Sequence, residues 1–134
     1  MKFEKINFRA LSIMYAFAII FVSSIPGDYL PRQEMFSWDK VFHFFEYFFF
    51  TLLIASAYIN SPNRRRRMKW IAYTLKIGII FPLSDEFYQS FIPGRTSSWL
   101  DVIADLSGVT IALFSLAYFY DYYQSKIQMN DKTT

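Results

Sequence analysis

Carboxylates crowd into the stretch from residue 84 to residue 105, SDEFYQSFIPGRTSSWLDVIAD, together with a glutamine and an arginine. Groups of these types act as general acids or bases, bind cations, or anchor phosphates and carboxylates. Long apolar runs lie on both sides of the stretch. Ionisable groups at or inside such segments are costly, so a functional site is the default hypothesis. The candidate residues here are Asp85, Glu86, Gln89, Arg95, Asp101 and Asp105.

A second polar group, which includes Lys40, stands where another apolar block begins. Asp39, His43 and Glu46 are spaced four and three residues apart, which places them on one helical face. A carboxylate, an imidazole and a second carboxylate on one face can bind a divalent cation or move a proton. The alternative is an ordinary helix start, with Asp39 as N-cap and His43 hydrogen-bonded at the membrane interface. Glu46 lies two turns inside an aromatic segment, so it must face protein or water.

Arg95 follows the turn-forming pair Pro93-Gly94, which fixes where its side chain starts. The guanidinium either pairs with a carboxylate of this chain or anchors a carboxylate or phosphate of a ligand. The adjacent carboxylates of Asp85 and Glu86 repel each other, so one of them is expected to be protonated or paired with Arg95.

Asp101 and Asp105 are one helical turn apart. Asp101 could cap a helix that follows two serines, whereas Asp105 lies too far along to be a cap. Small residues recur every four positions around and beyond Asp105, at Ala104, Gly108 and Ala112. Such a stripe lets two helices approach closely, so we interpret it as helix packing rather than chemistry.

Composition and patterning predict the elements that position these groups. Of 134 residues, 54% are hydrophobic and 22% aromatic, above the roughly 45–50% apolar content of ordinary domains. The apolar residues come in long blocks, which predicts an all-α, polytopic membrane protein made of one domain over residues 1–134. We expect spans at about 8–25, 41–59, 68–90 and 101–120, and a loose polar tail at 121–134. The many aromatic residues, including 48–50 and 118–123, are expected at the lipid surface and the interface.

The distribution of basic residues predicts the orientation of these four spans. Ten of the 14 Lys and Arg residues fall on the side that carries both termini and Arg64 to Arg67, so this side is expected in the cytoplasm. The loops at 28–40 and 84–100 then face outward, and the candidate polar residues all lie at one level near that side. The arginine run alone would also suggest nucleic-acid binding, but between two spans the topological explanation is simpler.

Two further features bound the interpretation. The apolar run at 10–22 follows basic residues like a signal peptide, but no A-x-A cleavage pattern ends it, which favours a first membrane helix. The absence of cysteine excludes disulfides, thiolate metal sites and cysteine nucleophiles.

The polar motifs resemble those of the VanZ-like family over about residues 37–113. The matching residues are Asp39-Lys40-Val41-Phe42-His43 with Tyr47, Ser84-Asp85-Glu86 with Gln89, Gly94-Arg95, Asp101-Val102 and Gly108. One position departs from the pattern, because Asp105 stands where the family usually has asparagine. The resemblance implies a small multi-pass protein of the bacterial cytoplasmic membrane. The family's namesake is associated with low-level resistance to the glycopeptide teicoplanin.

Two functions follow as expectations. The first is a non-enzymatic envelope protein whose outward polar residues bind an envelope lipid or amphiphile, with teicoplanin resistance as one possible outcome. The expected partners are then membrane lipid, a lipid-linked envelope precursor or a glycopeptide, and no nucleic acid. A transporter with proton-coupled Glu46 and Asp105 is a weaker alternative.

The second function is a membrane enzyme that acts on a lipid-linked envelope precursor. Asp85, Glu86 or Glu46 would serve as general acid or base, His43 as proton carrier or metal ligand, and Arg95 as phosphate anchor. The sequence contains no nucleotide-binding loop, Ser/His/Asp arrangement or zinc motif that favours a known reaction. No cofactor is therefore expected from a motif, while a divalent cation remains open.

The predicted topology can be tested by labelling, because the chain has no cysteine of its own. We expect Ser97→Cys to react with a membrane-impermeant maleimide in intact cells, since residue 97 lies in the second outward loop. Labelling that appears only after lysis would contradict the predicted orientation.

Overall fold

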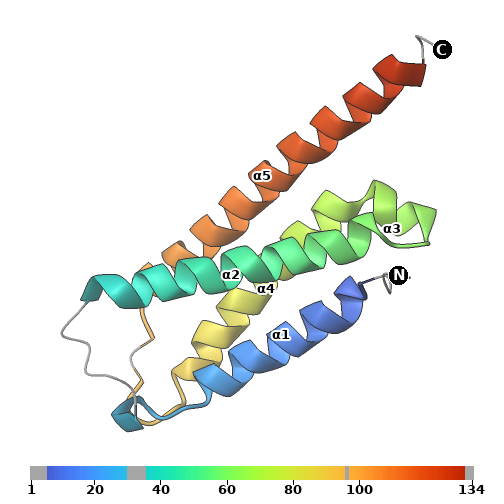
Figure 1. The fold of residues 1–134 in the computed structure, drawn as a ribbon. Coiled ribbons are helices and arrows are strands. Elements are labelled where there is room, and N and C mark those ends of the chain that lie inside the picture. Colours follow the sequence, from blue (N-terminus) through green and yellow to red (C-terminus); the bar gives the residue numbers. More distant parts are fainter. Residues whose placement is uncertain (1–5, 30–35, 96, 132–134) are drawn as a thin grey trace.

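The computed structural model of the chain describes residues 6–29, 36–95 and 97–131, and the regular elements in these ranges are all helical (Figure 1). In chain order they are α1 (Phe8–Ser23), the 3-10 helix η1 (Gly27–Tyr29), α2 (Phe36–Ile59), α3 (Arg64–Met68), α4 (Trp70–Gln89) and α5 (Trp99–Asp131).

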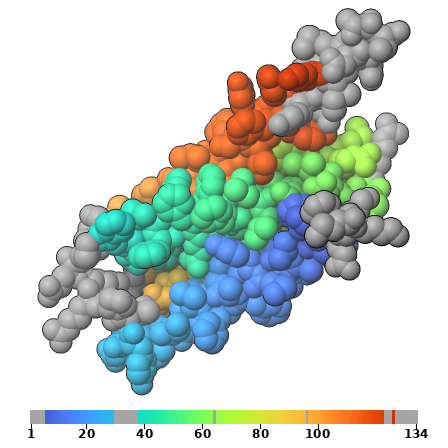
Figure 2. Space-filling model, in the orientation of Figure 1, coloured from blue at the N-terminus to red at the C-terminus, as the bar shows by residue number. Residues whose placement is uncertain are grey.

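Helix α2 lies at the centre of the bundle and contacts α1, α4 and, most extensively, α5. The connections after α1 and before α5 lie at one end of the bundle (Figure 1). The N-terminal end of α1 and the short helix α3 lie at the opposite end, and the last turns of α5 extend away from the other helices (Figure 1). The space-filling view shows α1 packed along α2 over most of its length (Figure 2).

Large apolar side chains cover much of the outside of the bundle, while several ionisable groups lie inside it beside an apolar core. Phe42 is 71% exposed and Phe114 74%, while His43, Asp101 and Asp105 are buried. Among the described residues, two helical stretches are long and apolar enough to cross a membrane: Trp38–Ile59 in α2 and Trp99–Tyr122 in α5. Helix α1 is a shorter apolar helix of 16 residues.

Close helix contacts are possible where glycines face a neighbouring helix. A Cβ atom on Gly108 of α5 would lie 2.2 Å from the carbonyl oxygen of Phe44 in α2, so only glycine fits at this crossing. A Cβ on Gly78 of α4 would lie 2.7 Å from a methyl group of Val109. Ala112 is also buried. These small residues let α5 approach both α2 and α4, as expected for helices that pack in a lipid environment.

Phe50 corrects one expectation, because it belongs to the core rather than to the lipid surface. It is 3% exposed, and its ring centroid lies 4.8 Å from that of Phe81. Phe50 follows the buried Tyr47 by three residues and precedes the buried Ile54 by four, so all three share the inward face of α2. Phe49, on another face, is exposed as expected.

Two helix boundaries also differ from expectation. Helix α2 begins at Phe36, so Asp39 lies inside its first turn and is not the N-cap. Helix α5 continues to Asp131, so the segment expected to be loose from residue 121 is helical as far as the structure describes it. Polar residues do not by themselves end a helix, and this segment contains neither proline nor glycine.

Two glycines join the loops at the end of the bundle where α1 stops. The amide of Gly27 donates a hydrogen bond of 3.0 Å to the carbonyl of Pro93. A Cβ on Gly27 would lie 1.8 Å from the carbonyl oxygen of Gly94, and Gly94 itself has a φ of 72°. The loop that carries Arg95 is therefore fixed against the end of α1 by backbone contacts that only glycine permits.

Candidate functional site

The ten candidate polar residues gather where α2 and α5 begin and where α1 and α4 end. We call these ten residues the polar cluster: Asp39, Lys40, His43 and Glu46 of α2, Asp85, Glu86 and Gln89 of α4, Arg95 of the following loop, and Asp101 and Asp105 of α5. Their contacts divide the cluster into one group between α2 and α5 and another between α1 and α4.

Lys40 links the first turns of α2 and α5. Its ammonium pairs with Asp39, 3.2 Å away, and with Asp101, whose side chain is only 3% exposed. From the sequence, Asp101 was a possible N-cap of α5. Instead, the Ser98 hydroxyl accepts a hydrogen bond of 3.1 Å from the amide of Leu100, which leaves the Asp101 carboxylate for Lys40. A carboxylate at this depth needs such a partner, because burying it unpaired would be costly.

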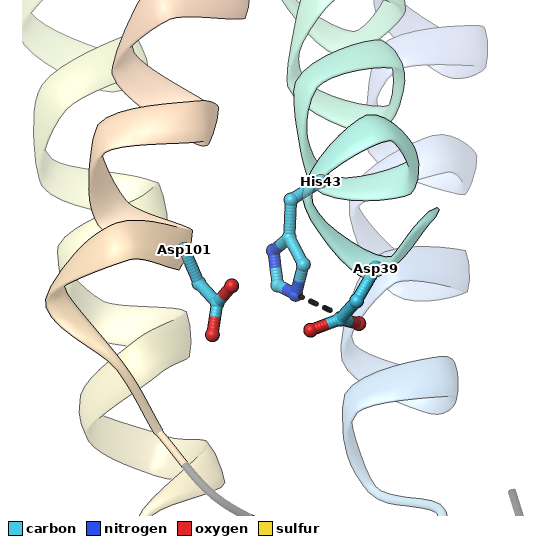
Figure 3. A group of neighbouring side chains, drawn as sticks. All are labelled: Asp39, His43 and Asp101. Carbon is cyan, nitrogen blue, oxygen red and sulfur yellow. Dashed lines mark ion pairs between the residues drawn. The ribbon is translucent and has the colours of Figure 1, made fainter. Parts of the chain in front are cut away.

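His43 and Asp105 form a buried pair one turn deeper. The Nδ1 atom of His43 lies 3.0 Å from Oδ1 of Asp105, which is 0% exposed. The other ring nitrogen, Nε2, lies 3.9 Å from Asp39 on the preceding turn of α2. Figure 3 shows the imidazole between the carboxylates of Asp39 and Asp101. A histidine with a carboxylate near each ring nitrogen is well placed to hold or transfer a proton.

Glu86 completes a buried donor set with His43 and Asp105. One Glu86 oxygen accepts a hydrogen bond of 3.2 Å from the amide of Ser98, while the other, Oε1, is buried without a hydrogen-bond partner. Oδ2 of Asp105 is likewise buried without one. One ligand atom from each of the three side chains lies within 4.8 Å of the other two. An imidazole nitrogen and two carboxylates suit a divalent cation such as Zn²⁺ or Mn²⁺.

A second set of possible ligands, Asp39, His43 and Asp101, meets the same distance limit. The Lys40 ammonium pairs with both of its carboxylates, however, and so already supplies a positive charge there. The set formed by His43, Glu86 and Asp105 is therefore the better candidate for a cation.

Asp85 and Gln89 face α1, away from the set formed by His43, Glu86 and Asp105. The hydroxyl of Ser23 donates a hydrogen bond of 2.9 Å to Asp85. The Gln89 amide nitrogen donates to the same Asp85 oxygen at 3.0 Å and to the Ser23 oxygen at 3.1 Å. Successive residues of a helix point about 100° apart, so the adjacent Asp85 and Glu86 contact different helices. Ser23 was not predicted, since a serine near the end of an apolar run gives little indication of its partner.

Within the described part of the chain, Arg95 forms no ion pair with a carboxylate, which was one of the two alternatives that the sequence left open. Its guanidinium donates a hydrogen bond of 3.1 Å to the carbonyl oxygen of Val22, in the last turn of α1. The same carbonyl also accepts a hydrogen bond of 3.1 Å from the amide of Ile25, so the guanidinium is its second donor. The geometry thus gives Arg95 a structural contact with α1.

Glu46 lies three residues beyond His43 in α2 and is half-buried. The neighbouring Tyr47 is fully buried.

Negative charge is in excess across the polar cluster. It contains six carboxylates, against the permanent cations Lys40 and Arg95 and the single histidine. Burying this many carboxylates requires protons, a bound cation or a ligand that donates hydrogen bonds.

A groove of about 330 Å³ leads to Glu86 between α4 and α5. Phe87 and Trp99 line it and are largely exposed, and Ser90 and Ser98 add polar groups. Glu86 is the one acidic residue in its lining, so the groove joins the apolar outer surface to the buried donor set.

The coupling between Lys40 and Asp101 can be measured. Lys40→Gln leaves Asp101 buried without its cation, so we expect the free energy of unfolding in detergent to fall by about 3 kcal/mol. Adding Asp101→Asn should restore part of that loss, because the double variant has no uncompensated charge. Lys76→Gln, at an exposed lysine of α4, serves as the control. A double variant that loses the sum of the two single effects would contradict the coupling.

Comparisons with known proteins identify the family to which this chain is similar. The VanZ/LLP1 family matches residues 2–120. An uncharacterized protein of the yeast Schizosaccharomyces pombe is 30% identical over 101 residues, which are 75% of this chain and 60% of the yeast protein. This chain therefore spans less than two thirds of that relative's length. No solved structure matches. The family match runs from before α1 to far along α5 and includes one apolar stretch and nearly all of the other, so this chain is a membrane protein that belongs to the VanZ/LLP1 family.

Proposed function

We propose that this chain acts in the cell envelope as a four-span protein of the bacterial cytoplasmic membrane. Both termini would lie in the cytoplasm, and the polar cluster would face outward and bind the headgroup of an envelope lipid or amphiphile. The arrangement of the helices supports this topology. The N-terminal end of α1 and the arginine-rich α3 lie at one end of the bundle, and the loops beside the polar cluster lie at the other (Figure 1).

The groove between α4 and α5 is the observation that carries the binding proposal. The apolar part of an amphiphile would lie between Phe87 and Trp99, and its headgroup would reach Glu86. Glu86 has a buried oxygen without a hydrogen-bond partner, which a headgroup donor would satisfy. Ligand sites commonly combine apolar walls with a few such polar groups.

The excess of carboxylates narrows the headgroup chemistry. A bare phosphate would be repelled by Glu86, Asp105 and Asp101, whereas an amine or a set of sugar hydroxyls would donate hydrogen bonds to them. Because Arg95 is in contact with the end of α1, it is less suited to anchor a phosphate than its sequence context indicated. We therefore favour an amphiphile with a donor-rich headgroup.

Low-level teicoplanin resistance would be one outcome of such binding, through reduced access of the glycopeptide to its target.

Susceptibility of a Gram-positive host tests this proposal. We expect the chain to raise the inhibitory concentration of teicoplanin and not that of vancomycin. Glu86→Gln and Trp99→Ala should abolish the increase at equal membrane abundance, because they remove the polar and apolar ends of the groove. Leu100→Ala, at the exposed residue next to Trp99 and outside the groove lining, should retain it. Wild-type levels of resistance in both groove variants would rule out the groove.

A second candidate function is a membrane enzyme acting on a lipid-linked envelope precursor. The buried set of His43, Glu86 and Asp105 favours it, because unpartnered carboxylate oxygens beside an imidazole suit either proton transfer or a bound cation. Turnover of polyprenyl-phosphate or peptidoglycan-precursor substrates by the purified protein, assayed with and without Zn²⁺ or Mn²⁺, separates this function from binding alone. We expect His43→Gln to remove any such turnover; activity that persists in this variant would exclude the set.

A further inference from the structure

The end of the bundle opposite the polar cluster carries a separate concentration of positive charge. Helix α3, Arg64–Met68, consists of four arginines and a methionine. Asn63 caps it, since its side-chain oxygen accepts a hydrogen bond of 3.2 Å from the amide of Arg66. The Arg67 guanidinium donates one of 3.4 Å to the carbonyl of Ser61, at the end of α2. These contacts hold the arginines of α3 beside the bundle.

A pocket of about 440 Å³ opens at this end, between α1, α2, α3 and α4. Arg9, from the first turn of α1, and Arg66, from α3, line it together. Positive side chains that lie far apart in the sequence therefore converge on one cavity. Among the described residues, no carboxylate lies within ion-pair distance of either arginine.

The lining of the pocket changes from charged to apolar along the helices. Ile13 follows Arg9 by one turn of α1, Ile54 precedes Tyr58 by one turn of α2, and Ile77 lies one turn beyond Tyr73 in α4. The rings of Tyr58 and Tyr73 stack with centroids 5.1 Å apart between these levels. The lining thus has charged side chains at the end of the bundle, tyrosines next and aliphatic side chains deeper. This order matches the change from headgroup to hydrocarbon across one half of a membrane.

We propose that this pocket binds an anionic phospholipid, with its phosphate between Arg9 and Arg66 and an acyl chain against Ile13, Ile54 and Ile77. Two guanidiniums that have no acidic partner in the part of the chain that the structure describes suit a phosphate diester, and guanidiniums pair with phosphate oxygens in bidentate geometry. The apolar depth of the pocket favours a lipid over free phosphate, which would leave that depth unfilled. Basic pockets between membrane helices on the cytoplasmic side are places where anionic headgroups bind.

This site is independent of the function proposed for the polar cluster. It lies at the opposite end of the bundle, shares no residue with the groove beside Glu86, and takes an anionic headgroup instead of one that donates hydrogen bonds to carboxylates. The lipid would join the start of α1 to α3 and α4, far from the contact of Ser23 with Asp85. Binding of the phospholipid in this pocket should therefore stabilise the fold without changing the chemistry of the polar cluster.

Native mass spectrometry of the purified chain tests the proposal, with phosphatidylglycerol and phosphatidylcholine supplied in equal amounts. We expect phosphatidylglycerol adducts to predominate on the wild-type protein. The double variant Arg9→Gln/Arg66→Gln should lower that preference by at least about tenfold, since each basic residue near anionic lipid contributes on the order of 1 kcal/mol. The control Arg65→Gln/Lys69→Gln removes the same charge from exposed positions outside the lining and should keep the preference.

A second variant tests the cavity without changing charge. Ala57→Phe places a ring in the pocket and should also lower phosphatidylglycerol binding, while the melting temperature without added lipid confirms folding. Phosphatidylglycerol should raise the melting temperature of the wild-type protein and not that of Arg9→Gln/Arg66→Gln. An unchanged preference in that double variant, an equal loss in the control pair, or displacement of the lipid by millimolar inorganic phosphate would each overturn the proposal.

Discussion

Neutralisation of buried carboxylates is the constraint on which the rest of this structure depends. Moving an apolar side chain from lipid into the protein interior contributes little free energy, because both surroundings are apolar. Packing, hydrogen bonds and charge pairs therefore have to hold the helices together. Lys40 with Asp101 and His43 with Asp105 connect α2 to α5, and Ser23 with Asp85 connects α1 to α4. The same contacts that position the candidate site therefore also set the rotation of the helices about their axes.

These charge pairs depend in turn on close backbone approach. Asp105 has a short side chain, and it reaches His43 because Gly108, less than one turn further along α5, lets that helix press against Phe44 of α2. Gly78 does the same between α4 and α5 at Val109. A long side chain at either glycine would separate the helices and leave buried charges beyond the reach of their partners. The glycines carry no chemistry, but the polar cluster requires them.

Helical periodicity predicted the shared face of Asp39, His43 and Glu46, and the succession of four expected spans predicted that the polar residues lie at one level. The sequence could not predict which neighbour each group would contact. Whether Asp85 or Glu86 faces α1 depends on the rotation of α4, which only the packed neighbours determine. For Arg95 the sequence left open a carboxylate of this chain or a group of a ligand, because sequence reasoning compares side chains, whereas its partner in the structure is the backbone carbonyl of Val22. Phe50 was misplaced for a similar reason: a run of aromatic residues does not reveal which ring faces inward.

The interlocked loops at Gly27 and Gly94 have a consequence for biosynthesis. Ser23 and Gln89, which meet beside these glycines, are 66 residues apart in the chain. During translation, α1 and α2 are therefore made well before the groups that secure the end of α1 exist. Bringing such distant segments together costs loop-closure entropy, and the formation of local helices does not offset that cost. The end of the bundle that holds the polar cluster must therefore acquire its final geometry late, after the turn at Gly94 has been synthesised and α5 has docked.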